Sequence, residues 1–208
     1  GATFSDRPSP LKRMFKERKT LQGVDKKAPD AAQYFGGAGQ EYLEEYGTKP
    51  ATFAKISEKA RIHAAKNPFA VFRDLLSVDE IMESPHIYGP LTRYQCCPPT
   101  CGAAAAVVCS AEFAAKHGLN NAITIRAQSM KTDFASTLEA HSLRKLVGVD
   151  MAKAAADEVF EEAGIGPEDV QVVELHDCFT ANELLTYCLL YTSDAADERS
   201  SVDLGGRR

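Results

Sequence analysis

The feature that most constrains the fold of this 208-residue chain is an alternation of helix and strand signals toward its C-terminal end. Apolar side chains recur at helical spacing over 150–163, and Gly164 follows as a stop signal. Pro167–Asp169 indicates a turn, Val170–Leu175 an apolar strand, and Thr180–Tyr187 a second helix. This order is typical of an α/β layer with a largely parallel sheet.

Upstream, the sequence predicts more helices and leaves one segment ambiguous. Alanine favours helix over 96–108, whereas the flanking prolines and glycine and Val107-Val108 also allow a buried strand. The remaining expected elements are a helix at 40–46 ended by Gly47, a helix at 50–66 ended by Asn67-Pro68, a helix at 77–82 started by a capping box, a helix at 110–118, and a strand at 122–128.

Residues 1–33 are polar and basic and contain several prolines. A solvated loop is the simplest interpretation of such a charge run. The alternative is that these side chains lie near a phosphate-bearing ligand. The cationic side chains concerned are Lys12, Arg13, Lys16, Arg18, Lys19, Lys26 and Lys27.

Bulk properties exclude several classes of protein. A net charge of -5 argues against a general nucleic-acid binder. No apolar run is long enough to span a membrane, and the first residues lack the apolar core of a secretory signal. We therefore expect a protein that is not secreted, with its six cysteines reduced. A first residue of Gly rather than Met indicates that the natural start is missing.

The best candidate for chemistry is the segment His176–Phe179, at the carboxyl end of the predicted strand. Ligands bind at this edge of open α/β sheets. Thr180 and Glu183 have capping-box spacing, which places Cys178 just before a helix N-terminus. The helix dipole there favours a thiolate, and His176 lies two residues away, so the pair suits proton transfer or nucleophilic attack. The alternative is a Cys178 that only packs.

The other cysteines invite a metal-binding hypothesis, which we rank lowest. Cys96 and Cys97 are adjacent and cannot easily both bind one tetrahedral ion. Cys101 and Cys109 complete no C-x-x-C spacing. The sequence therefore predicts no metal site and inert thiols at these positions.

Several motifs resemble thiolases of the sterol carrier protein type, in the order of that family. They are QYFGGAGQEYLEEYGTKPATFAKI (33–56), NPFAVFRD (67–74), QCCPPTCGAAAAVVCSAEFAAKHGL (95–119), GVDMAKAAADEVFEEAGI (148–165) and VVELHDCFTANELLTY (172–187). The resemblance covers about residues 2–187. It implies a partial thiolase-like α/β fold, with 1–94 as the loop domain, 95–121 as the end of the N-terminal half and 122–187 as the start of the C-terminal half. It also makes the ambiguous alanine segment a strand.

The resemblance implies an acyltransferase that cleaves or forms a 3-oxoacyl-CoA, in lipid or sterol side-chain metabolism or fatty-acid β-oxidation. By that likeness Cys178 is the acid–base residue and His176 binds the thioester oxygen. Coenzyme A is then a co-substrate, no cofactor is permanently bound, and the parent is a homodimer. It would be cytoplasmic in bacteria and peroxisomal in eukaryotes. The alternative is a non-catalytic module that binds acyl-CoA or lipid.

The chain also departs from the family pattern. No segment resembles the family's nucleophilic-cysteine region, and no Gly-His-Pro motif follows residue 187. We therefore expect an incomplete fragment that is inactive alone. Residues 188–208, CLLYTSDAADERSSVDLGGRR, resemble translated sequencing adapter, and the polar composition of 192–208 predicts disorder.

Overall fold

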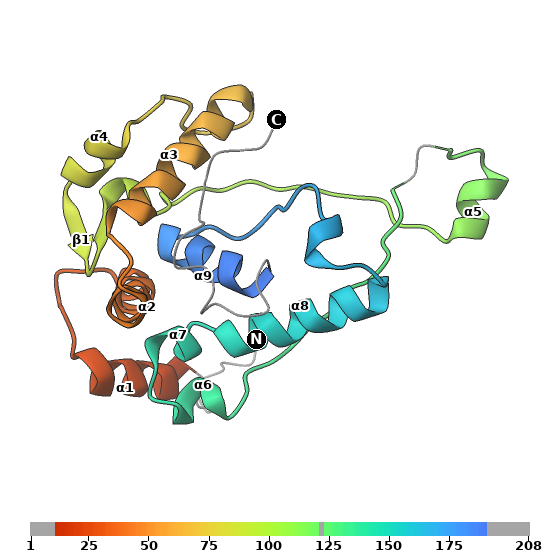
Figure 1. The fold of residues 1–208 in the computed structure, drawn as a ribbon. Coiled ribbons are helices and arrows are strands. Elements are labelled where there is room, and N and C mark those ends of the chain that lie inside the picture. The colour runs from red at the N-terminus through yellow and green to blue at the C-terminus, as the bar shows by residue number, and fades with distance from the viewer. Residues whose placement is uncertain (1–10, 121–122, 191–208) are drawn as a thin grey trace, which may run out of the picture.

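A computed structural model describes residues 11–120 and 123–190 (Figure 1). The expected disorder of 192–208 and the first residues of the basic segment lie outside these ranges. The elements are α1 (Leu11–Gln22), α2 (Asp30–Tyr46), α3 (Ala51–Lys66), α4 (Val78–Glu83), β1 (His86–Tyr88), β2 (Leu91–Thr92), α5 (Ala111–Lys116), α6 (Ser136–Glu139), α7 (Leu143–Leu146), α8 (Val149–Ala163) and α9 (Thr180–Leu190), with 3-10 turns η2 (Arg93–Gln95) and η3 (Pro167–Asp169).

Local capping signals set many of the helix ends, as the sequence predicts. Ser77 and Glu80 form a reciprocal capping box at the start of α4. Gly47 and Gly164 end α2 and α8 in the left-handed conformation that glycine adopts without steric cost. Ser110 accepts a hydrogen bond from the backbone of Phe113 and starts α5.

The interpretation of residues 1–33 as a loop is wrong for the described part, because α1 occupies much of it. The physical reason is a long-range contact: the Arg18 side chain is buried and donates hydrogen bonds to Gln33 and, at 2.8 Å, to Asp30. Phe15 also packs near Tyr34, with ring centroids 6.1 Å apart. Charge patterning along the sequence does not reveal these partners.

Two adjoining apolar clusters form the core, and α2 and α9 contribute to both. The first joins α2, α3, β2 and α9 around Phe53, Ile56 and Leu184, which are almost fully buried. Burying one such side chain stabilises the fold by about 1.5–3 kcal/mol. Gly36 lets α2 approach the β1–β2 turn, because a Cβ there would lie 2.7 Å from the Tyr88 carbonyl oxygen.

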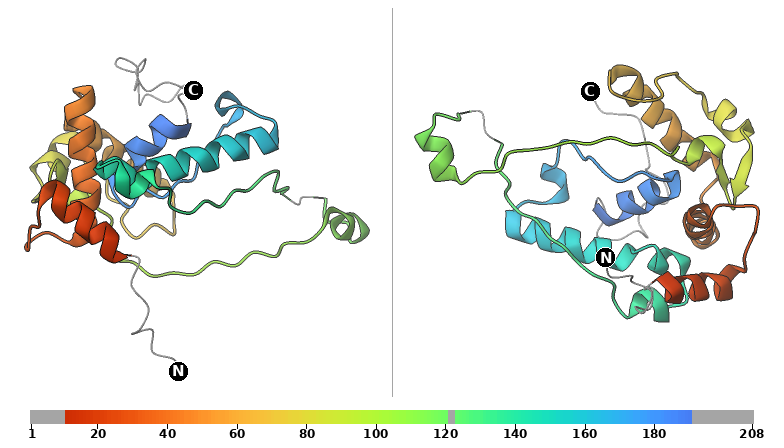
Figure 2. Two further views of the ribbon diagram at one scale, coloured as in Figure 1. Left: turned by 90° about the horizontal axis from the view of Figure 1, so that it is seen from below. Right: turned by 180° about the vertical axis from the view of Figure 1, so that it is seen from behind.

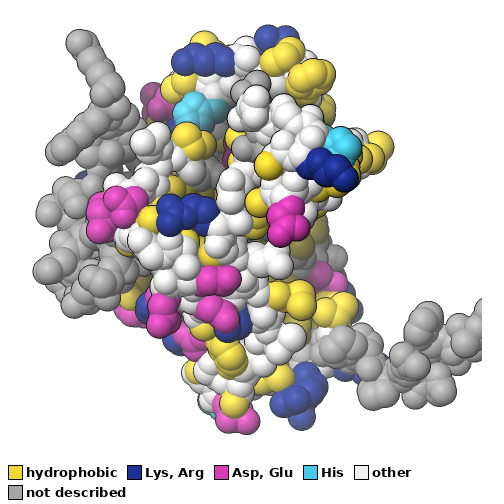
Figure 3. Space-filling model, turned by 90° about the vertical axis from the view of Figure 1, so that its right-hand side faces the viewer, with side chains coloured by type: hydrophobic (Ala, Val, Ile, Leu, Met, Phe, Trp, Pro, Cys, Tyr) yellow, Lys and Arg dark blue, Asp and Glu magenta, His cyan; other side chains and the backbone are white. Residues whose placement is uncertain are grey.

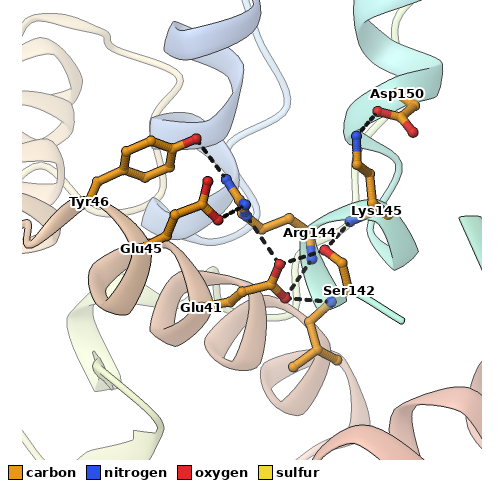
Figure 4. A network of polar contacts seen from close by, with 8 residues as sticks. Glu41, Glu45, Tyr46, Ser142, Arg144, Lys145 and Asp150 are labelled. Atoms are coloured by element: carbon orange, nitrogen blue, oxygen red, sulfur yellow. Dashed lines mark hydrogen bonds and ion pairs between the residues drawn. The ribbon is translucent and has the colours of Figure 1, made fainter. Parts of the chain in front are cut away.

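A polar network fixes α7 against α2 (Figure 4). The Glu41 carboxylate accepts hydrogen bonds from the Ser142 hydroxyl at 2.5 Å and from the Leu143 backbone at 2.6 Å. The Arg144 guanidinium pairs with Glu41 at 3.2 Å and also with Glu45. A carboxylate therefore satisfies the free N–H groups at the start of α7, where the helix dipole also favours negative charge.

The one sheet in the described ranges is the antiparallel pair β1–β2, in which Tyr88 pairs with Leu91. The predicted strands at 96–108, 122–128 and 170–175 form no ladder in their described residues. A strand requires a partner in register, and local pattern alone does not supply one. Val107, Ile123 and Val172 are consequently 98%, 93% and 80% exposed.

Two of these extended segments carry α5 away from the packed body, as the views in Figures 1 and 2 agree. Helices α8 and α9 lie side by side, and α9 also packs against α3 and α2. Acidic and basic side chains are interspersed over the face drawn in Figure 3. None of the described helices combines the length and the hydropathy that a membrane crossing needs.

Candidate functional site

The candidate loop His176–Phe179 is anchored on both sides of Cys178. Phe179 is buried and stacks on Phe35, with ring centroids 5.0 Å apart. The backbone N–H of Cys97 donates to the Cys178 carbonyl at 2.9 Å, and Cys96 and Phe179 form an isolated antiparallel bridge. Tertiary contacts therefore position Cys178 at the start of α9.

Burial and, to a smaller extent, the neighbouring Cys97 together raise the pKa of the half-buried Cys178 thiol to about 11. Hydrogen bonds from the backbone of Phe179 and of Cys178 itself lower the pKa, but they are the smaller effects. The expectation that the helix N-terminus favours a thiolate is therefore wrong, because desolvation outweighs the helix end. Cys178 is a protonated thiol at neutral pH.

His176 occupies the same loop, and its side chain is exposed. The Asn182 side chain donates a hydrogen bond to the His176 carbonyl, which ties the loop back onto the first turn of α9. Within the described ranges no hydrogen bond joins the His176 ring to the Cys178 thiol. The roles predicted for His176 and Cys178 remain predictions.

The expected capping box at the start of α9 does not form. Glu183 is buried and pairs instead with Lys59 of α3 and with the Tyr187 hydroxyl. The Thr180 hydroxyl is buried and has no hydrogen-bond partner among the described residues. The pairing of Lys59 with Glu183 spans α3 and α9, so sequence spacing could not indicate it.

A pocket of about 370 Å³ lies between α3, the segment around Val71 and Phe72, and the start of α9. Asp177 and Thr180, which flank Cys178 in the sequence, both line it. Further lining comes from Ile56, Ser57, Ala60, Arg61, Ala64, Ala70, Tyr94, Gln95, Cys96, Cys97, Pro98 and Glu183. Its volume lies at the lower end of the roughly 300–1,000 Å³ typical of small-molecule pockets.

Arg61 is the notable cation of this pocket, and sequence reasoning missed it. Its guanidinium lies 5.3 Å from the ring centroid of Phe72 and 5.8 Å from that of Tyr94. No carboxylate pairs with Arg61 in the part of the chain that the structure describes. A guanidinium over aromatic rings can hold a phosphate or another anion. Only folding brings α3, Phe72 and Tyr94 together.

A second open pocket, of about 620 Å³, lies beside α2 and includes Glu41, Tyr88 and His141. It does not adjoin the Cys178 loop, so we place the candidate site at the smaller pocket. In residues 11–120 and 123–190, no three side chains of His, Cys, Asp or Glu gather in a way that could hold a metal ion.

Comparison with known proteins gives the family context. Residues 133–191 match the family model described as thiolase C-terminal domain-like. Sterol carrier protein 2 of Rattus norvegicus is 47% identical over 206 residues, and that of Homo sapiens is 44% identical over 206 residues. Each alignment covers 99% of this chain and 38% of the relative. The benzoylsuccinyl-CoA thiolase subunit BbsB of Thauera aromatica is 40% identical over 151 residues, 72% of this chain and 38% of that protein.

The chain thus spans about 38% of the length of these sterol carrier proteins. The predicted fold class, a partial thiolase-like α/β fold, is confirmed by the thiolase match and by the helix-rich structure with its small sheet. The resemblance inferred from the motifs is confirmed as well. The chain is thus similar to a segment of these longer sterol carrier proteins, and its residues 133–191 are similar to the thiolase C-terminal domain.

Proposed function

We propose that this segment carries the proton-transfer loop of a thiolase that acts on coenzyme A thioesters. Cys178 is the acid–base residue, and His176 donates a hydrogen bond to the thioester oxygen. Relatives named as a benzoylsuccinyl-CoA thiolase subunit and as an acetyl-CoA acetyltransferase support this substrate class. Coenzyme A is the co-substrate, and the wider setting is lipid metabolism in the cytoplasm or the peroxisome, with a homodimeric parent.

The observation that carries the proposal is the protonated, half-buried thiol of Cys178, whose sequence neighbours Asp177 and Thr180 line the α3–α9 pocket. Cleavage of the bond between Cα and Cβ of a 3-oxoacyl thioester leaves negative charge on the α-carbon and the thioester oxygen. A neutral thiol at that carbon supplies the missing proton. The backbone N–H of Phe179 then stabilises the thiolate that remains. General acid–base catalysis of this kind contributes about 10²–10⁴-fold in rate.

The exposed ring of His176 is available to a ligand. An N–H donor aimed at the thioester oxygen stabilises the developing enolate, which is worth about 10²–10³-fold in rate. The Asn182 contact to the His176 carbonyl limits the movement of this loop. Loss of the Asn182 amide would therefore affect the position of His176 more than its chemistry.

The pocket also supports the binding part of the proposal. Ala60, Ala64 and Phe72 offer apolar surface to an acyl chain or to a pantetheine arm. Arg61 offers a cation without a carboxylate partner in the described ranges to a coenzyme A phosphate. The same features favour the second candidate function, a non-catalytic module that binds acyl-CoA or lipid.

Hydrogen–deuterium exchange at the α-carbon of acetyl-CoA separates the two functions, because it needs proton transfer but no acyl transfer. We expect the chain to bind acetyl-CoA by calorimetry and to accelerate the exchange in deuterated buffer, as followed by NMR. Cys178→Ala should abolish the acceleration and keep the binding, while Cys109→Ser, a change at an exposed thiol, should preserve both.

Binding without any accelerated exchange would favour the binding module. Absence of binding would contradict both functions. Arg61→Met tests the anion contact: it should weaken the binding of acetyl-CoA, whereas Lys55→Met at an exposed position of α3 should not.

A further inference from the structure

Cys97 and Cys178 lie opposite each other where the segment after η2 meets the candidate loop. The isolated bridge pairs Cys96 with Phe179 in antiparallel register. One step forward on one segment and one step back on the other therefore places Cys97 against Cys178. The hydrogen bond from the Cys97 N–H to the Cys178 carbonyl, 2.9 Å long, confirms this register.

This register suits a disulfide bond. Directly opposed residues of an antiparallel pair have Cα atoms about 4.5–5.5 Å apart and side chains on the same face. Disulfides join residues whose Cα atoms are about 4.4–6.8 Å apart. Cys96, the neighbour of Cys97, is paired with Phe179 in this register, and its thiol donates to the Thr92 carbonyl at 3.4 Å.

The two thiols also differ in their accessibility to a soluble oxidant. Cys97 is exposed and can meet a soluble oxidant, whereas Cys178 is half-buried beside it. A sulfenic acid formed on Cys97 would thus have a second thiol as its nearest reaction partner. This is the arrangement of a reactive cysteine next to a resolving cysteine.

We propose that Cys97 and Cys178 form a reversible disulfide when the protein meets a peroxide. The Cys97 sulfur attacks hydrogen peroxide, the O–O bond breaks, and sulfenic acid and one water form. The Cys178 sulfur then attacks the Cys97 sulfur, the S–O bond breaks, and a second water leaves. In total two thiols lose two protons and two electrons, and one peroxide becomes two waters.

The consequence for activity rests on the proposed function. A Cys178 sulfur bound to Cys97 has no proton to donate, so oxidation would stop proton transfer at the candidate site. Reduction by a dithiol would restore the thiol. The disulfide itself can be detected without any activity measurement, so its failure and that of the proposed function are distinguishable.

The test is peptide mapping of the full chain after treatment with hydrogen peroxide and blocking of the remaining thiols. Trypsin releases Cys97 in the peptide 94–116 and Cys178 in the peptide 154–199. We expect these two peptides to be cross-linked without reductant and separated by dithiothreitol. The cross-link should be lost in Cys97→Ser and in Cys178→Ser.

Cys96→Ser is the matched control, because Cys96 is adjacent in sequence but pairs with Phe179 rather than with Cys178, and it should retain the cross-link. Since Cys97 is exposed, its serine variant should keep the fold, which circular dichroism can check. A cross-link that persists in Cys97→Ser would overturn the proposal, because another cysteine of the same peptide would then be the partner. Absence of any cross-link in the unmutated chain would overturn it as well.

Discussion

The raised pKa of Cys178 makes its reactivity a direct reporter of the site. Burial and the neighbouring Cys97 raise this pKa from 9.0 to about 11. Alkylation requires the thiolate, which forms only as the pH approaches the pKa. The rate of Cys178 alkylation should therefore keep rising with pH well beyond the range in which an ordinary cysteine is already ionised.

The size of the effect follows from the two pKa values. At a pH well below 9.0, a pKa of about 11 leaves ~100-fold less thiolate than the ordinary pKa of 9.0 does. Partial burial slows the reagent further, but that effect does not depend on pH. Cys97→Ser removes one of the causes of the increase and should move the rise in rate to lower pH, while the larger effect of burial remains.

The assay is alkylation by iodoacetamide at a series of pH values, with each cysteine followed by mass spectrometry. The exposed Cys101 serves as an internal reference in the same sample. We expect Cys178 to react far more slowly than Cys101 near neutral pH and to catch up only under strongly alkaline conditions. Equal rates near neutral pH would refute the reasoning and restore the activated thiolate predicted from the helix end.

Two further predictions concern stability. Glu41→Ala removes the hydrogen bonds to Ser142 and Leu143 and should lower the free energy of unfolding by about 2 kcal/mol. Glu45→Ala removes only a more exposed ion pair with Arg144 and should lower it by about 0.5 kcal/mol. Equal losses in urea denaturation would contradict the assigned network. The thiols of Cys96 and Cys178 both have pKa values raised from 9.0 to about 11. As the pH rises, the unfolded chain therefore releases these protons before the folded chain does. The contribution of the two protonated thiols to the stability of the fold is complete below pH 9.0 and is lost as the pH rises through about 11. A melting temperature that stays constant from pH 9 to 11 would contradict this prediction.

The parts of the fold that the sequence predicts well are those with local causes. The capping box of Ser77 and Glu80 and the glycine stop at Gly164 each involve neighbours within a few residues. The helix α1 was missed because its stabilising partners for Arg18 lie 12 and 15 residues further along the chain. The strand at 170–175 was predicted from apolar pattern alone, but a ladder also needs a partner segment.

In the candidate site, too, features with local causes are predicted well and features that depend on tertiary contacts are not. The motif predicts where Cys178 and His176 lie in the sequence, and the structure places both in one loop at the start of α9. The pKa of Cys178 was predicted in the wrong direction because burial and Cys97 are tertiary effects. Arg61 was missed for the same reason, since its aromatic neighbours Phe72 and Tyr94 come from other segments.

The most direct test of the central claim, that Cys178 transfers the proton, is the turnover of acetoacetyl-CoA with coenzyme A. It is best measured in a protein of the relatives' length that carries this segment. Cys178→Ala should lower turnover by roughly 10²–10⁴-fold, with the fold unchanged by circular dichroism. His176→Ala should lower it by about 10²–10³-fold. Turnover of folded Cys178→Ala within a few fold of the unmutated protein would contradict the claim and leave Cys178 as a packed thiol.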